Sequence, residues 1–156
     1  MTHLSIRALL LASLMTTACA TAGPRQDYNV QRDLSFPNHT YDEVWDALVK
    51  VFHDEGWPTE TVAKDSGLIS TPWGGLNRKP GWVDCGPGSN FAIDRNKTGR
   101  FSVLVRETAA TITVNISTDF RIYREGIFQS YSEDQCVSTG MLEQRIKVLV
   151  TSNLMG

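Results

Sequence analysis

The chain contains three cysteines, and their positions suggest different chemistry. Cys19 lies near the N-terminus, whereas Cys85 and Cys136 lie in the remainder of the chain. In an exported protein two such cysteines form a disulfide in most cases, because the compartment is oxidising. A bond between Cys85 and Cys136 would stabilise the fold by about 4 kcal/mol in the chain-entropy model. The alternatives are a reactive thiol or a metal site, but a zinc site would need two more ligands at short spacing.

Histidines and carboxylates form no recognisable catalytic or metal-binding pattern. His39 precedes an expected helix and His53 lies on it near its C-terminal end, and neither is spaced from a cysteine as zinc ligands are. Gly86-Pro87-Gly88 follows a loop and lacks a subsequent lysine, unlike a phosphate-binding loop. We therefore expect a protein that is not an enzyme and needs no metal or cofactor. A hydrolase is the less favoured alternative, and two loops would have to meet to pair its candidate carboxylates, Asp84, Asp94, Glu133 and Asp134.

Aromatic and cationic side chains favour binding over catalysis. Exposed aromatic residues with arginine nearby are typical of protein–protein hot spots. The disulfide would bring two expected loops, 74–90 and 126–135, near each other. One alternative is a glycan that stacks on Trp82, and another is that the aromatic side chains fold inward as core. The expected partner-binding residues are Trp73, Trp82, Arg78, Phe128 and Tyr131.

The N-terminal residues have the pattern of an export signal. Arg7 supplies the positive start, and Ala8–Met15 is an apolar run too short to span a bilayer. The following residues, Leu14-Met15-Thr16-Thr17-Ala18-Cys19, resemble the lipobox of bacterial lipoproteins, with Thr16 where leucine is commonest. The resemblance implies that residues 1–18 are removed and that Cys19 carries lipid, palmitate included. Ordinary signal-peptidase cleavage after Ala20 is the alternative.

The expected lipid would anchor the protein to a membrane without a spanning helix. Ala20, rather than aspartate, follows Cys19, which resembles lipoproteins sent to the outer membrane of Gram-negative cells. We therefore expect the periplasmic face of the outer membrane, or the periplasm if the lipid is absent. Residues 19–27 are small and polar and read as a short tether.

The remaining residues, 28–156, suit one domain with one core. The net charge of the whole chain is -2 and no run of basic residues occurs, so nucleic-acid binding is not expected. The spacing predicts a helix that begins after Thr40, with a capping box to Glu43, and ends at Gly56. Ser138 or Thr139 is expected to cap a final helix. Alternation predicts strands over 28–36, 57–63, 68–73, 100–107 and 111–123.

These elements predict an α+β fold: an antiparallel sheet of four or five strands with two helices on one face, in the order β-α-β-β-loop-β-β-α. The runs Tyr41–Leu48, Gly56-Trp57 and Asp65–Thr71 resemble the opening of the helix-grip domains of BamC, a lipoprotein of the outer-membrane β-barrel assembly machinery. The resemblance implies a structural or accessory role with an envelope protein as partner. A ligand- or glycan-binding periplasmic module is the alternative.

Overall fold

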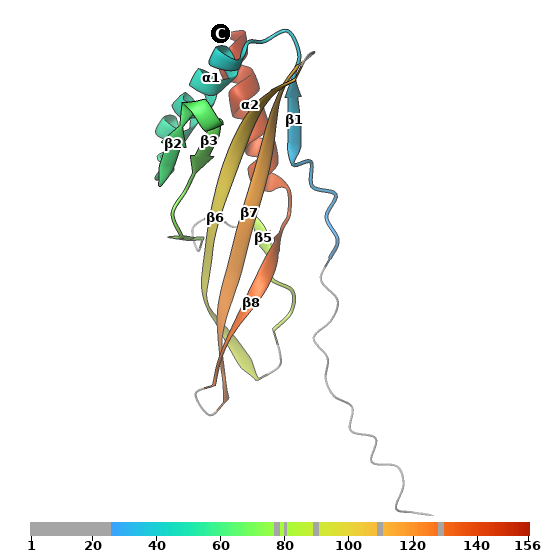
Figure 1. Cartoon of the computed structure of the whole chain (residues 1–156). Coiled ribbons are helices and arrows are strands. Elements are labelled where there is room, and N and C mark those ends of the chain that lie inside the picture. Colours follow the sequence, from blue (N-terminus) through green and yellow to red (C-terminus); the bar gives the residue numbers. More distant parts are fainter. Residues whose placement is uncertain (1–25, 77–78, 80, 89–90, 109–110, 128–129) are drawn as a thin grey trace, which may run out of the picture.

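A computed structural model describes residues 26–76, 79, 81–88, 91–108, 111–127 and 130–156. They form an α+β fold in which two helices pack on an antiparallel sheet (Figure 1). The predicted class is therefore confirmed. The sheet is open and has eight strands rather than four or five. The lipobox-like residues, Cys19 included, lie outside the described residues.

Two long strands run the length of the molecule. β6 (Ala92–Thr108) and β7 (Thr111–Gly126) contain 17 and 16 residues, about three times the usual strand length. They pair along their whole length, with one shift in register between Asp94 and Asn96. Because the helices cover only one end of this pair, the other end extends away from them as an arm (Figure 1). The two strands predicted here exist, but both are longer than expected.

The edge of β6 carries short strands. β3 (Leu68–Ser70) pairs with β6 and with β2 (Thr61–Ala63), which forms the predicted hairpin. A 3-10 turn over Lys64–Ser66 joins β2 to β3. β4 (Gly74–Gly75) pairs with β6 further toward the arm.

The edge of β7 is shared by two strands. β1 (Asp33–Phe36) pairs with β7 at the end covered by the helices, and β8 (Tyr131–Ser138) pairs with β7 along the arm. β5 (Val83–Asp84) then pairs with β8. The first strand is therefore shorter than the predicted span of 28–36.

Two predicted loops contain strands. The expected loop 126–135 includes most of β8, and the expected loop 74–90 includes β4 and β5. The sequence pattern did not predict β8, because the arm is open to solvent and only Cys136 and Ser138 of this strand are buried. A strand without a buried face lacks the apolar alternation by which a sequence reveals it.

The first helix, α1 (Tyr41–Asp54), has the predicted ends. The Thr40 hydroxyl accepts a hydrogen bond from the Glu43 amide at 3.3 Å, and the Glu43 carboxylate accepts one from the Thr40 amide at 2.8 Å. These two bonds make the capping box. Gly56 follows the helix with φ of 63°, a conformation that glycine adopts without strain.

The second helix, α2 (Met141–Met155), begins differently from the prediction. Its N-cap is Gly140, with φ of 89° and no side-chain cap, rather than Ser138 or Thr139. The Ser138 hydroxyl instead accepts from the Gly140 amide and donates to Glu143 at 2.8 Å. The start of the helix is therefore set by a buried contact between Ser138 and Glu143, which local capping rules do not reveal.

One hydrophobic core lies between the helices and one face of the sheet. Val103 of β6 lies opposite Ile116 of β7, and Val105 lies opposite Val114. All four are at most 3% exposed and belong to the same core as the buried residues of both helices. The alternate residues of these strands point to the other face, which neither helix covers (Figure 1). Among the residues described, neither helix is long and apolar enough to cross a membrane.

Candidate functional site

The predicted disulfide is present. Cys85 and Cys136 are bonded, with their Cα atoms 4.2 Å apart, and each residue is about 5% exposed. The bond fastens the segment after β5 to the middle of β8. Because both sulfurs are buried and bonded to each other, this pair is a covalent link in the fold and not a reactive thiol.

Trp82 lies in the core. Its ring meets Trp57 edge to face at a centroid separation of 6.1 Å, and Trp57 packs in turn on Phe101 at 5.2 Å. Only 8% of Trp82 is exposed. The Lys79 ammonium lies over its ring, 5.1 Å from the centroid. Trp82 therefore matches the alternative in which the aromatic side chains fold inward as core, and its buried ring is not open to a glycan.

Trp73 lies in a different setting and is 40% exposed. The guanidinium carbons of Arg100 and Arg121 lie 5.0 and 4.6 Å from its ring centroid. Such cation–π contacts hold an aromatic ring in place at the surface. Arg100 and Arg121 neighbour the buried Phe101 and Phe120 in their strands, so they point to the face opposite the helices. Trp73 therefore belongs to the uncovered face of the sheet.

Charged side chains on this uncovered face form a connected network. Arg121 donates to Glu133 at 2.6 Å and to Asp119 at 3.3 Å. Hydrogen bonds from Arg121 and then from Tyr123 lower the pKa of Glu133. The hydrogen bond between Tyr123 and Glu133 also raises the pKa of Tyr123. Glu133 and Asp119 in turn raise the pKa of Arg121. The network fixes the arginine that packs on Trp73.

The predicted aromatic cluster is thus divided. Trp82 packs on Trp57, which contacts the helix-facing Phe101. Trp73 packs on Arg100 and Arg121, which point to the opposite face of the sheet. Tyr131 is 74% exposed and pairs with Glu125 at the far end of the arm. Arg78 and Phe128 lie outside the described residues. Of the predicted partner-binding residues, Trp73 and Tyr131 are exposed.

A buried arginine organises the same region, and no motif in the sequence pointed to it. Arg124 is 6% exposed and donates to Asp94 at 2.8 Å and to Asp134 at 2.7 Å. Its remaining nitrogen donates to the carbonyl oxygens of Cys85 and Gly86 at 3.1 and 3.0 Å. The one feature of the sequence that could have revealed Arg124 is its spacing in β7. It follows Phe120 and Ile122 at every second position, so all three point to the buried face of the strand.

The carboxylates considered for a hydrolase already have structural partners. Asp94 and Asp134 both accept from Arg124, and Glu133 accepts from Arg121. The oxygens of Asp84 accept from the Tyr28 hydroxyl and from the Gly86 amide. His53 is exposed, and His39 lies 3.7 Å from Glu43 at the start of α1. No cluster of three or more metal-ligating side chains occurs within the described ranges.

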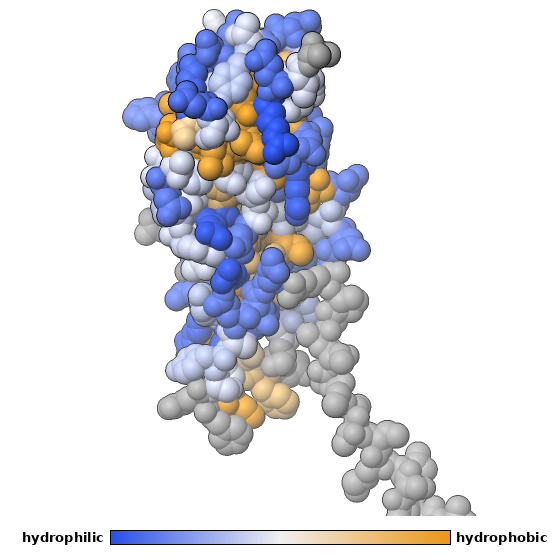
Figure 2. All heavy atoms as spheres, viewed as in Figure 1, coloured by the Kyte–Doolittle hydropathy of each residue, from blue (hydrophilic) through white to orange (hydrophobic). Residues whose placement is uncertain are grey.

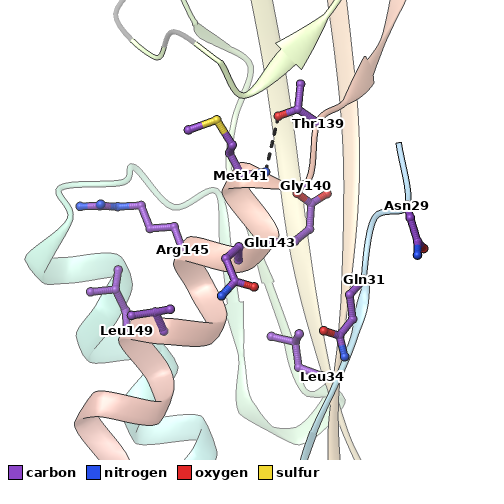
Figure 3. A pocket seen from close by; sticks show the side chains of 11 residues that line it. Asn29, Gln31, Leu34, Thr139, Gly140, Met141, Glu143, Arg145 and Leu149 are labelled. Atoms are coloured by element: carbon purple, nitrogen blue, oxygen red, sulfur yellow. Dashed lines mark hydrogen bonds between the residues drawn. The ribbon is translucent and has the colours of Figure 1, made fainter. Parts of the chain in front are cut away.

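An open groove of about 960 Å³ lies beside the start of α2 (Figure 3). Asn29 and Gln31 line it from the segment before β1, and Met141, Glu143 and Arg145 line it from α2. Glu143 is 1% exposed. One of its oxygens accepts from Ser138, while Oε1 has no hydrogen-bond partner among the described residues. The groove therefore has apolar side chains on its helix side, and the unpaired Oε1 of Glu143 is buried behind them.

Comparison with known proteins yields no matching family model and no matching curated protein.

Proposed function

We propose that this protein is a bacterial envelope lipoprotein that holds another envelope protein at the outer membrane. Residues 1–18 direct export, Cys19 carries the lipid, and the domain over 28–156 binds the partner. The role is structural or accessory, in assembly or maintenance of the outer membrane. The buried disulfide supports the compartment, because such bonds persist where the surroundings are oxidising.

The observation that supports a binding role is Trp73 on the uncovered face of the sheet. The ring is 40% exposed and is packed between Arg100 and Arg121. Tryptophan and arginine are the residue types that contribute most at protein interfaces, especially when they are already held in place. The carboxylates of Asp119 and Glu133, which accept hydrogen bonds from Arg121, supply a polar rim around this site.

Intact mass spectrometry of the protein extracted from membranes tests the anchor. The expected mass is that of a chain beginning at Cys19 with acyl groups, and reduction should add two hydrogens. A chain cleaved after Ala20 without lipid would contradict the lipoprotein proposal.

Site-specific photocrosslinking in the envelope tests the binding face. A crosslinker at Ser117, on the uncovered face, should capture a defined partner, whereas one at Val148 of α2 should not. With the purified partner, Trp73→Ala should weaken binding by about 2 kcal/mol, the loss typical of an interface hot spot. Val62→Ala removes another exposed apolar residue and should change the affinity little. Equal losses in both variants would contradict the assignment of this face.

The groove beside α2 favours a second candidate, a ligand-binding module. The Glu143 carboxylate, whose buried Oε1 is unpaired, would turn toward the groove to accept from a ligand ammonium or amide, while Met141 and Leu149 would contact an apolar portion. Titration with an alkylamine, followed by NMR, tests this candidate. Shifts confined to the groove and lost in Glu143→Gln would favour it, and an absence of shifts would exclude alkylamines as its ligands.

A further inference from the structure

The far end of the arm carries a group of exposed apolar side chains. Phe91, Ile93, Ile127 and Tyr131, here called the arm tip, are 68%, 60%, 56% and 74% exposed. Figure 2 shows hydrophobic side chains gathered at this end, away from the helices. Apolar groups concentrated at one extremity of a protein mark a contact with a protein or a membrane.

The strand register makes the arm tip one continuous surface. Ile93 and Tyr131 both pair with Glu125, from opposite sides, so the three side chains form one row across the arm. Ala92 pairs with Gly126 in the next row, which places the neighbouring Phe91 and Ile127 at the very end. Side chains in adjacent positions of a sheet lie about 5 Å apart. The four apolar residues can therefore enter one surface together.

Charges near the arm tip are paired. Arg95 donates to Glu125 at 2.7 Å, and Arg124 binds both Asp94 and Asp134. These contacts leave no cluster of free cations among the described residues of this end, so attraction to anionic groups does not dominate. Tyrosine and phenylalanine with aliphatic neighbours suit the boundary between lipid headgroups and acyl chains. The chemistry therefore favours a lipid surface entered by apolar contact.

The expected position of the lipid anchor agrees with this occupant. Tyr28 lies near the level of Phe120 along β7. Its hydroxyl donates to Asp84, and Asp84 pairs with the β8 residue that follows Cys136. Cys136 in turn pairs with Phe120. Cys19 precedes Tyr28 by nine residues, which can span up to about 30 Å. Gly126 lies six residues beyond Phe120 along β7, or about 20 Å. The chain from Tyr28 is thus long enough for Cys19 to reach the level of the arm tip.

We infer that the arm tip inserts into the surface of the bilayer that holds the lipid on Cys19. This inference rests on the proposed lipoprotein function for the identity of the membrane. Two points of attachment would hold the arm against the bilayer and direct α1 and α2 away from it. The groove beside α2 and the helical end would then face the aqueous compartment.

Photocrosslinking to lipid tests the inference on the protein as the cell processes it. The protein is extracted from membranes and reconstituted into vesicles of phosphatidylethanolamine and phosphatidylglycerol that contain a diazirine phospholipid. Peptide mass spectrometry then locates the adducts. Adducts should concentrate on the peptides with the arm tip, and raising the salt concentration should reduce them little.

Two variants sharpen the test. Replacing the four arm-tip residues with serine should lower adducts on the arm by about tenfold or more, since each residue loses apolar contact with lipid. Replacing Met141, Val148 and Met155 with serine removes exposed apolar groups from α2 and should leave arm adducts unchanged. Circular dichroism and thermal unfolding should match the native protein in both, because all seven residues are exposed.

The outcomes separate the two proposals. Adducts spread evenly over the surface, adducts on α2, or arm adducts that persist in the serine variant would overturn arm-tip insertion. A crosslinked dimer joined through the arm tip, without lipid adducts, would overturn it as well.

If intact mass shows acylated Cys19 but the arm lacks adducts, arm-tip insertion fails and the lipoprotein proposal stands. If the chain is not acylated yet the arm tip bears adducts, the lipoprotein proposal fails and insertion stands.

Discussion

Arg124 is the residue on which the arm and the disulfide segment both depend. It is a buried cation with two carboxylate partners and two carbonyl partners, so its four hydrogen bonds link β7 to β6, to β8 and to the segment after β5. A buried charge is tolerated only when its hydrogen-bonding capacity is used. Its role here is structural.

Replacing Arg124 should therefore destabilise the protein. In Arg124→Gln the carbonyl oxygens of Cys85 and Gly86 lose a charged donor, and we expect a loss of about 2 kcal/mol in the free energy of unfolding. Arg95→Gln is the matched control, because Arg95 is half exposed and its bond to Glu125 is worth under about 1 kcal/mol. Urea denaturation measures both. Equal losses in the two variants would contradict the structural role of Arg124.

Glu133 should make stability depend on pH on the acidic side. Its pKa is lowered in the folded protein by Arg121 and then Tyr123, so its contribution is complete above the ordinary glutamate pKa. That contribution is lost as the pH falls through the lowered value. Glu133→Gln should flatten the decline of the urea midpoint between about pH 5 and pH 3. An unchanged decline, or an NMR titration of Glu133 at the ordinary pKa, would contradict this prediction.

At the scale of the element, the hairpin of β2 and β3 depends on a close contact at Gly67. This residue has φ of 71°, and its carbonyl accepts from the Val105 amide at 2.8 Å. A Cβ here would overlap the carbonyl oxygen of Val105. The turn thus requires glycine both for its conformation and for its approach to β6.

Gly67→Ala should cost about 2 to 4 kcal/mol of stability, from strain and steric overlap together. Gly56→Ala isolates the strain, because Gly56 has a similar φ of 63° but open space around its Cβ position. That variant should cost only about 1 kcal/mol. Thermal and urea unfolding provide the comparison. A Gly67→Ala variant no less stable than Gly56→Ala would show that β3 does not pack this closely on β6.

At the scale of the whole molecule, the disulfide lies at the edge of the core and joins β8 to the segment after β5. β5 has two residues and β8 is mostly exposed, so apolar burial contributes little to their association. The bond between Cys85 and Cys136 closes a loop of 51 residues. The arm therefore owes part of its order to a covalent link.

Removing that link should lower the free energy of unfolding by about 4 kcal/mol. The double variant Cys85→Ser, Cys136→Ser and the reduced native protein should show similar losses in urea. The double variant should not respond to added reductant. Lower global stability should accelerate hydrogen exchange in every element, with a further increase in β5 and β8 from local opening. An increase in β5 and β8 no larger than that in α1 would contradict the proposed local role of the bond.

Local rules were sufficient for α1, the β2–β3 hairpin and the paired apolar faces of β6 and β7, because each depends on caps, turn residues or alternation within a short stretch. The disulfide followed from there being only two cysteines after Cys19. The length of the arm, β8 and the cap of α2 were not predictable in this way. The arm and β8 depend on pairing between residues distant in sequence, and most of the residues of β8 are polar. The cap of α2 depends on a buried hydrogen bond between Ser138 and Glu143 that capping patterns do not include.

The aromatic residues show the same division. The sequence by itself determined that Trp73 and Trp82 flank one glycine-rich segment, and residue type suggested a shared surface. Only the tertiary structure decided that Trp82 packs on Trp57 in the core while Trp73 lies across the sheet between two arginines. The physical reason is that a sheet has two faces. Which face a residue joins depends on strand pairing and on where the helices lie, and neither is encoded within the segment itself.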